Sequence, residues 1–573
     1  MDELLDDYLN GGSYTQKHWN APDAFLKEDD TPVHYIQQLA LFINQYSWLY
    51  RERTIDFFLN DVWSLVPVEW HEPLLSMTDT ECLWFASADV VKDTWPQSLR
   101  TFVTEAKRLW MPKTVKRDEQ RWKMPDFALP SLKLKMSEKK IHEIKRMAEL
   151  VDSVAIIMKP DEIVDIGSGE GYLTQVLSHQ YHHSLTAIDC SESFIGGAIK
   201  RQNQIEVERV SARMKALNVV SSTTTTNNNN KDVVQEEIVE GDDETTTITK
   251  KKIKIRLTPE QQQELADRKK MEKLEKRKAL LDEMDISGPK MCVAMISPEM
   301  KNDDFINLLA KHDSSKQYQS IMMIGLHTCG TLASTMIANY VQCNRVNCLV
   351  DVGCCYYRIP GHSYQFLSES ARGLVELGPA ALKLSCEASD FSYGTRSDDQ
   401  LYSLNEFKYS MKVHFFRVIF ETALIRLYGA DHSFTIRCIS RANSATFELY
   451  AQSALKRMTS QLDKQRKDGG GVHDNRSLPT LDQLMEIYHQ YENDQKKISL
   501  FLLLRGLIAP VLESYIVMDR WLFLDESRQH TEKVTGQTST LRSFIVPIFE
   551  ETISPRNYAI LSFKQPLTKQ MPQ

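Results

Sequence analysis

The chain has 573 residues, more than one typical hydrophobic core can organise, so we expect two or three structural units. Hydrophobic residues make up 42% of the chain and charged residues 25%, as in an ordinary globular protein. The net charge of −8 excludes a global positive field that would attract nucleic acid, so any such attraction would have to be local.

The N-terminus and the apolar runs indicate the compartment. The first ten residues, MDELLDDYLN, lack the basic and apolar regions of a signal peptide. No uninterrupted apolar run approaches a membrane span, because Arg505 breaks the nearest candidate at 500–508. We therefore expect an intracellular protein, cytoplasmic or nuclear, with no membrane partner and with its ten cysteines reduced.

Residues 1–130 are expected to form a helical N-terminal region rich in aromatic side chains. Apolar residues recur with helical spacing at 35–43 and again at 55–63. Because large aromatic residues are usually buried, we expect the tryptophans of this region to pack in a core rather than to bind substrate.

A second region, 131–573, begins with a helix capped by Ser137 and continues into a strand–turn–helix–strand unit. The apolar run that starts at Ile163 ends in Asp165, and the glycine-rich turn GSGEG follows directly. A second apolar run, 185–188, ends in Asp189. Glycines let the backbone approach a ligand where a Cβ would collide, and an acid ending the second strand can accept hydrogen bonds from ribose hydroxyls.

The glycine spacing helps to decide which ligand binds. The third glycine comes one residue earlier than in the dinucleotide fingerprint, and Tyr172 stands where that fingerprint needs glycine. An Asp-x-Gly-x-Gly-x-Gly turn with an acid ending the next strand resembles the first motif of the seven-stranded S-adenosylmethionine-dependent methyltransferases. The predicted cofactor-binding residues are Asp165, Gly167, Ser168, Gly169, Gly171 and Asp189.

Two polar segments interrupt the second region. Residues 211–289 hold a Thr/Asn tract, which has no apolar surface to bury and should be disordered, followed by a charged stretch of strong helix formers. A polar loop containing three glycines lies at 464–477. Between and after these segments, strand-like runs occur at 291–296, 321–326, 348–352, 544–549 and 558–563. We predict an α/β fold with a Rossmann-like, mostly parallel sheet that ends in an antiparallel strand.

Polar, nucleophile-rich loops follow two of these strands. His327 and Cys329 follow one strand, and Cys354 and Cys355 follow the next. Ligands of open α/β sheets sit beyond the carboxyl ends of the strands, so these four residues, the candidate catalytic group, should lie beside the cofactor site.

Three functional interpretations of these loops stay open, beside the simpler one that they hold structural thiols. His327 can act as a general base or orienting group while the loops position an acceptor. One cysteine can be a covalent nucleophile, as in enzymes that methylate pyrimidine C5. Alternatively, His327, Cys329 and Cys354 or Cys355 can bind zinc, although these spacings are not the usual C-x₂-C knuckles, and we assign no metal ligand. The loop after the first strand lacks the Asn/Asp-Pro-Pro-Tyr pattern, which argues against adenine N6 methylation.

Four motifs together resemble those of the methyltransferase-like protein 25 family, which includes the ribosomal RNA adenine dimethylase domain-containing protein. They are MSEKKIHEI at 136–144, GLHTCG at 325–330, GCCYY at 353–357 and ISPRNYAI at 553–560. The resemblance implies a seven-stranded methyltransferase fold that uses S-adenosylmethionine. The first loop also resembles that of a clade methylating transfer RNA ribose, in which the second loop continues into histidine, where Tyr356 and Tyr357 stand here. We expect RNA as methyl acceptor, with protein second; the alternative is a non-catalytic scaffold that keeps the fold.

Overall fold

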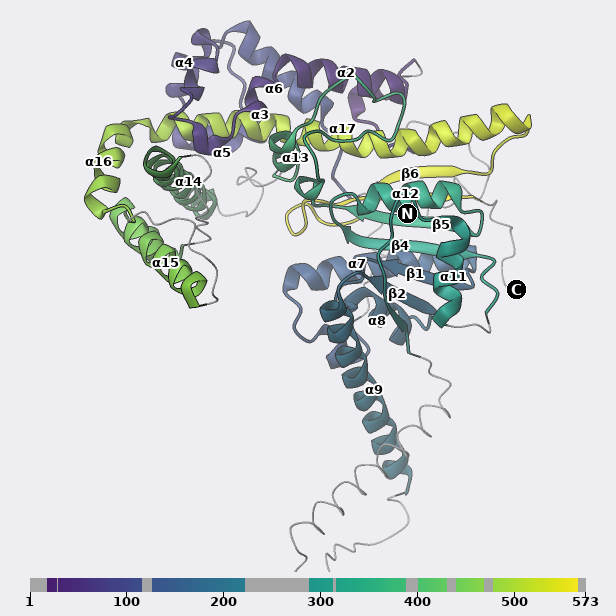
Figure 1. Ribbon diagram of the computed structural model, residues 1–573. Helices are drawn as coiled ribbons and strands as arrows, with labels where there is room; N and C mark the ends of the chain where they lie inside the picture. The colour runs from purple at the N-terminus through teal and green to yellow at the C-terminus, as the bar shows by residue number, and fades with distance from the viewer. Residues whose placement is uncertain are drawn as a thin grey trace, which may run out of the picture.

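The computed structural model describes residues 18–27, 29–115, 126–221, 288–312, 316–387, 400–429, 439–467 and 478–564. Seven strands form one sheet in the order β3-β2-β1-β4-β5-β7-β6 (Figure 1). Their bounds are β1 Glu162–Ile166, β2 Leu185–Asp189, β3 Lys290–Val293, β4 Ile321–Thr328, β5 Val346–Gly353, β6 Arg542–Pro547 and β7 Tyr558–Phe563. The first five pair in parallel, and β7 runs antiparallel to both β5 and β6. The predicted fold class is confirmed.

Several strand ends differ from the sequence prediction, among them the carboxyl ends of β3, β4 and β5. β3 stops at Val293 rather than at Ile296, because it pairs only with β2 and that strand ends at Asp189, opposite Val293. β4 and β5 instead run further than predicted, to Thr328 and Gly353, because each has a partner along its carboxyl end. His327 therefore belongs to a strand rather than to the loop after it.

Helices cover both faces of the sheet. On one face, α7 and α8 pack over Ile163, Met322 and Val350. On the other, α11, α12 and the end of α17 pack over Val164, Met323 and other side chains that point the opposite way. The bounds are α7 Glu138–Met158, α8 Tyr172–His179, α9 Glu192–Ser221, α11 Asn302–His312, α12 Leu332–Gln342 and α17 Gln495–Thr535. The predicted cap of α7 is confirmed, since the Ser137 hydroxyl accepts a hydrogen bond from the Lys140 amide.

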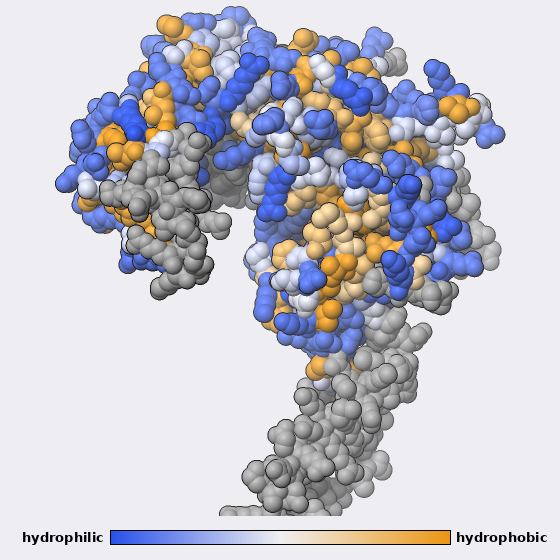
Figure 2. Space-filling model, viewed as in Figure 1, coloured by the Kyte–Doolittle hydropathy of each residue, from blue (hydrophilic) through white to orange (hydrophobic). Residues whose placement is uncertain are grey.

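A helical layer lies above the sheet in Figure 1, built around α17. Its helices are α2 Pro32–Gln45, α3 Trp48–Arg51, α4 Val68–Leu75, α5 Asp79–Phe85, α6 Gln97–Leu109, α13 Pro379–Ser385, α14 Gln400–Tyr428, α15 Phe447–Lys467 and α16 Leu481–Tyr491. Short 3-10 helices are η1 Asp23–Phe25, η2 Thr54–Asp56, η3 Val62–Leu65, η4 Pro130–Lys133, η5 Tyr356–Arg358, η7 Ala442–Ser444 and η8 Glu492–Asp494. Below α17 in Figure 1, the sheet lies on one side and an arm formed by α14, α15 and α16 lies on the other. The space between them makes this side of the molecule concave (Figures 1 and 2).

The hydrophobic cores divide the chain differently from the predicted regions 1–130 and 131–573. One core joins buried residues of 19–111 to buried residues of 356–522, so the N-terminal helices and α17 are packed as one body. Four tryptophans of the N-terminal region lie in this core, as predicted: Trp19, Trp63, Trp70 and Trp95.

One described stretch, Leu481–Thr535, is long and apolar enough to cross a membrane by length and composition. However, 94% of its most apolar window is buried inside the protein. Arg505 lies within this stretch and donates hydrogen bonds to the carbonyl oxygens of Leu49 and Glu52 at 2.5 and 2.9 Å. The stretch is thus packed as the central helix of the larger core.

The two predicted polar segments begin later than expected. α9 continues without a break to Ser221, so residues 211–221 are helical, and residues 222–287 lie outside the described ranges. α15 likewise continues to Lys467, and residues 468–477 lie outside the described ranges.

Candidate functional site

The glycine turn after β1 needs its glycines for two different reasons. Gly167, Gly169 and Gly171 have φ angles of +71°, +57° and +69°, in the left-handed region that other residues rarely adopt. A Cβ on Gly167 would lie 2.8 Å from Leu332 Cδ2, and one on Gly171 would lie 3.0 Å from Ala198 Cβ. A Cβ on Gly169 would meet no atom within 4 Å. The outer glycines therefore permit close packing, whereas the middle one borders open space.

Asp189 fastens this turn to the end of β2. Its carboxylate is 9% exposed and accepts hydrogen bonds from the amides of Gly169 and Ser191, each at 2.9 Å. Each carboxylate oxygen keeps a second lone pair, so Asp189 can also accept hydrogen bonds from ligand hydroxyls. Ser168, between the glycines, has a buried hydroxyl oxygen with no hydrogen-bond partner among the described residues.

Asp165 lies deeper than Asp189, against α8. It is 2% exposed and accepts a hydrogen bond of 2.5 Å from the Thr174 hydroxyl. Burial raises its pKa to about 6, and the nearby Asp189 charge adds to this effect, while the bond from Thr174 opposes it. In the structure, Asp165 thus holds the first turns of α8 beneath the glycine turn.

His327 sits in a bulge of β4 and turns toward α7. The β4–β5 pairing shifts register between Leu326 and Thr328, and His327 has a φ of +63°. Such a bulge redirects the side chain of the extra residue. Its Nε2 lies 3.0 Å from Glu143 Oε2, and its side chain is 38% exposed. Nδ1 makes no hydrogen bond within the part of the chain that the structure describes.

Glu143 is a buried carboxylate that joins three segments. It is 3% exposed, and its Oε1 accepts a hydrogen bond of 2.6 Å from the Ser554 hydroxyl. Burial by itself would raise its pKa, but hydrogen bonds from His327 and Ser554, with the charge of Lys139, lower the pKa overall. An ionised Glu143 only accepts hydrogen bonds, so the proton of the neutral imidazole lies on Nε2 and Nδ1 is left as a proton acceptor.

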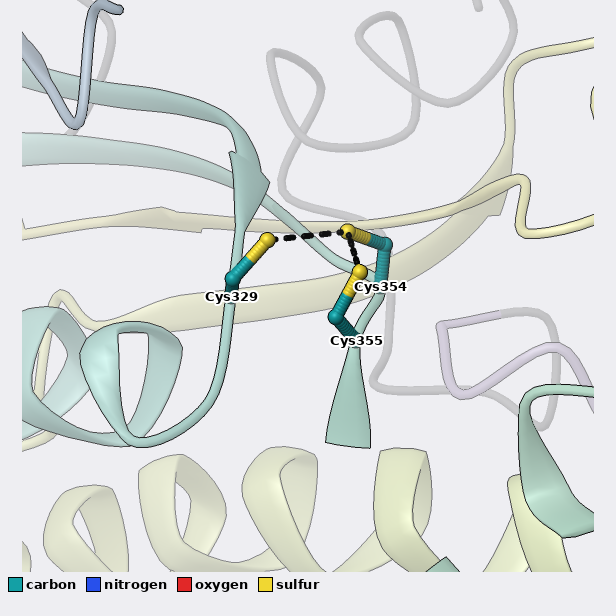
Figure 3. A group of neighbouring side chains, drawn as sticks. All are labelled: Cys329, Cys354 and Cys355. Atoms are coloured by element: carbon teal, nitrogen blue, oxygen red, sulfur yellow. Dashed lines mark hydrogen bonds between the residues drawn. The ribbon is translucent and has the colours of Figure 1, made fainter. Parts of the chain in front are cut away.

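The three predicted loop cysteines come together at the ends of β4 and β5 (Figure 3). The sulfur of Cys354 lies 3.7 Å from that of Cys329 and 3.3 Å from that of Cys355. All three sulfurs lie within 4.8 Å of one another, and His327 is not in this group. The combination of His327 with two cysteines as ligands of one ion is therefore wrong, because the imidazole is held at Glu143.

Charges and hydrogen bonds give the three thiols different pKa values. Hydrogen bonds from Cys329 and Cys354 lower the pKa of Cys355, and the positive charges of Arg556 and Arg358 lower it further. Hydrogen bonds with Cys329 and Cys355 raise the pKa of Cys354, and burial raises it further. The cluster therefore favours a single thiolate, on Cys355.

Sequence reasoning missed Glu143, Ser554 and Arg556. The Arg556 guanidinium donates to the Cys386 carbonyl at 2.7 Å, and the Cys386 thiol donates to the Cys354 carbonyl at 3.4 Å. A signal was present, since all three missed residues lie in motifs that carry the family resemblance. Without the fold, however, nothing indicated that those motifs meet around one site.

A cavity of about 930 Å³ lies elsewhere, between α5, α14 and α17. Its wall carries Lys408, but this lysine is paired with Asp79 at 2.7 Å. None of the predicted site residues lines this cavity, so it is separate from the glycine turn and the cysteines.

Comparison with known proteins agrees with this architecture. Residues 139–362 match the family described as "Methyltransferase domain", a span that contains Glu143, the glycine turn and the three cysteines. The chain is 22% identical over 480 residues to "Probable methyltransferase-like protein 25" of Mus musculus, and 22% identical over 492 residues to the protein of that name in Homo sapiens. Each match covers 75% of this chain and 75% of the relative. The family prediction is confirmed to this extent: the chain contains a methyltransferase domain and is similar to methyltransferase-like protein 25 over three quarters of its length.

Proposed function

We propose that this protein transfers a methyl group from S-adenosylmethionine to RNA. The observation that carries the proposal is the open space over Gly169, bordered by the Asp189 carboxylate and the unpartnered Ser168 hydroxyl. A ligand with ribose hydroxyls and polar groups fits such a set of donors and acceptors.

The residues of the turn divide the binding between them. Asp189 would hold the ribose hydroxyls, and the amides and hydroxyl of 167–169 would hold the polar groups beside it. The bound donor supplies a methyl group already activated on a sulfonium, so alignment of the acceptor accounts for much of the catalysis.

His327 would receive the proton that the acceptor loses. Glu143 fixes the imidazole through Nε2, which leaves Nδ1 to accept a hydrogen bond from the attacking group. Register places the His327 end of β4 beside the end of β1, from which the glycine turn starts. A proton acceptor at this position suits a hydroxyl, which must lose its proton as it is methylated.

RNA is the acceptor that these features favour, at a group such as a ribose hydroxyl. The loop His327–Gly330 is similar to that of a clade acting on transfer RNA ribose, and the strand ends open on the concave side of the molecule near α13 (Figures 1 and 2). Protein is the second acceptor class.

Two measurements test the proposal. Calorimetric titration of the folded protein with S-adenosylmethionine should show binding. No detectable heat of binding would contradict the proposal and favour the alternative of a non-catalytic scaffold. Transfer of labelled methyl from the donor into fractionated RNA and protein should place the label in RNA, in a ribose-methylated nucleoside after digestion. Label found only in protein would overturn the RNA assignment.

A further inference from the structure

The three sulfur atoms of Figure 3 are arranged as the donors of a metal site would be. Cys329 comes from the end of β4, and Cys354 and Cys355 come from the end of β5, so two loops supply three donors. All three cysteines are free thiols. Their sulfurs lie within 4.8 Å of one another, a separation that one ion can bridge.

The distances are close to those that zinc requires. With Zn–S bonds of about 2.3 Å, the sulfurs of a tetrahedral site lie about 3.8 Å apart. The Cys329–Cys354 separation is 3.7 Å, and the Cys354–Cys355 separation is 3.3 Å. Of these two distances, the first already fits and the second has to widen by roughly half an ångström. Cys355 has φ −101° and ψ 68°, which turns the chain into η5 and brings adjacent cysteines to the same side.

The backbone around the sulfurs is held in place by contacts that do not involve them. The Gly330 amide donates to the Cys355 carbonyl at 3.2 Å, which joins the two loops. A Cβ on Gly330 would lie 3.0 Å from the Arg358 carbonyl oxygen, so the loops approach as closely as only glycine permits. On the other side, the Cys386 thiol donates to the Cys354 carbonyl. Donors fixed in this way lose little freedom when they bind an ion.

The surrounding charges suit a three-thiolate centre. Zinc with three thiolates carries one net negative charge, and the Arg358 and Arg556 guanidiniums lie close enough to act on the Cys355 sulfur. Thiolates are soft ligands that select zinc over magnesium or calcium.

We propose that Cys329, Cys354 and Cys355 bind one zinc ion and leave its fourth position open. Cys354 is buried, whereas Cys329 and Cys355 are partly exposed, so the open position faces out of the loops. Three protein ligands with an exchangeable fourth are typical of catalytic rather than structural zinc sites. The proposal goes beyond methyl transfer and does not depend on it, because the glycine turn contributes none of the donors.

Metal binding by the intact chain tests the proposal. The purified protein is reduced with a phosphine, stripped of metal and titrated with Co²⁺ alone and then with Zn²⁺. We expect thiolate-to-cobalt charge-transfer absorption that saturates at one ion per chain and disappears when zinc displaces cobalt. A folded wild-type protein that shows no such absorption and purifies without zinc would overturn the proposal.

Variants assign the donors. Cys329→Ser and Cys355→Ser replace the two partly exposed sulfurs, so folding should persist, which circular dichroism verifies. Each should lose the charge-transfer absorption. Cys82→Ser and Cys190→Ser are the matched controls, one buried and one exposed, and both should bind cobalt as the wild type does. Undiminished absorption in both loop variants would show that the ion sits elsewhere.

Discussion

Glu143 and His327, separated by 184 positions in the chain, share a hydrogen bond of 3.0 Å between Oε2 and Nε2. The carboxylate is buried and the imidazole is partly exposed, and the contact fixes one ring nitrogen of the imidazole. This relationship turns a histidine in a strand bulge into an oriented proton acceptor.

The substitution Glu143→Gln should slow methyl transfer without weakening donor binding. Glutamine keeps the volume and can still bond Ser554, but it removes the charge that fixes the Nε2 proton. Since general-base catalysis contributes about 10²–10⁴-fold, we expect kcat to fall by roughly 10–100-fold with an unchanged donor Kd. Lys139→Met is the control, because Lys139 lies 3.8 Å from Glu143 and its side chain is 44% exposed. Equal kcat values for wild type and Glu143→Gln would remove Glu143 from the mechanism.

The substitution Asp189→Ala should weaken donor binding. It removes the proposed acceptor for ligand hydroxyls and also frees the Gly169 amide, so the calorimetric affinity should fall by about 1–3 kcal/mol. Asp161→Ala is a matched control, since Asp161 also accepts hydrogen bonds from two backbone amides, those of Gln319 and Ser320. These contacts lie at the amino ends of the strands, opposite to the end that carries Asp189. Similar affinity losses in both variants would indicate a general loss of structure rather than a lost ligand contact.

The substitution Gly169→Ala, compared with a matched glycine substitution, distinguishes the loss of space for a ligand from strain in the backbone. An alanine at a φ of +57° costs about 1–2 kcal/mol in stability, and its methyl group would also enter the space over the turn. Gly373→Ala carries the same backbone cost at a φ of +78°, also with no atom within 4 Å, but far from the turn in sequence. We expect comparable losses of unfolding free energy in the two variants and a loss of S-adenosylmethionine binding only in Gly169→Ala. Normal donor affinity in Gly169→Ala would place the donor elsewhere.

Asp165 should make the protein less stable as the pH rises. Its pKa is raised from 3.8 to about 6 on folding, so between these pH values the folded chain binds a proton that the unfolded chain does not. The contribution to stability is complete below pH 3.8 and is lost as the pH rises through 6. At about 1.4 kcal/mol for each pH unit, the wild type should lose on the order of 3 kcal/mol relative to Asp165→Asn.

Denaturant unfolding of wild type and Asp165→Asn on the acid and neutral sides of this range measures that difference. Asparagine can still accept the Thr174 hydrogen bond and cannot ionise. Parallel stability–pH curves for the two proteins would contradict the raised pKa.

Lys113→Met should destabilise the protein strongly. Lys113 forms an ion pair of 2.7 Å with Glu513 of α17, with side-chain exposures of 7% and 1%, and also donates to the Pro555 carbonyl. Removing one partner of a buried pair costs about 3–5 kcal/mol, because the remaining charge is uncompensated. Lys107→Met breaks a pair of similar length with Asp89 on the surface, where the cost is about 0–1 kcal/mol. Similar unfolding midpoints for the two variants would show that the Lys113–Glu513 pair does not stabilise the packing of the N-terminal region against α17.

The sheet could be predicted from the sequence because its strands are short apolar runs bounded by glycine, proline or acidic residues. Residues 558–563 were placed without error, and the glycine turn was placed to the residue. Strand ends were less accurate. Whether β4 continues to Thr328 depends on a partner in β5, and β3 stops where β2 stops.

The division of the chain into cores could not be predicted in the same way. Apolar spacing shows that a helix has a buried face, but not which element covers that face. The N-terminal helices and α17 are complementary, yet they lie some 400 positions apart, as the hydrogen bond from the Trp110 indole to the Leu507 carbonyl shows at a separation of 397.

The sequence by itself determined the glycine turn, its acid partners, the sheet and the family resemblance, because these depend on local spacing and on residue types that tolerate few conformations. Only the tertiary structure decided that His327 faces Glu143 and Ser554 while the three cysteine sulfurs gather at a separate point. These contacts join segments from residue 143 to residue 554, and their distances follow from how strands and helices pack, which no local pattern records.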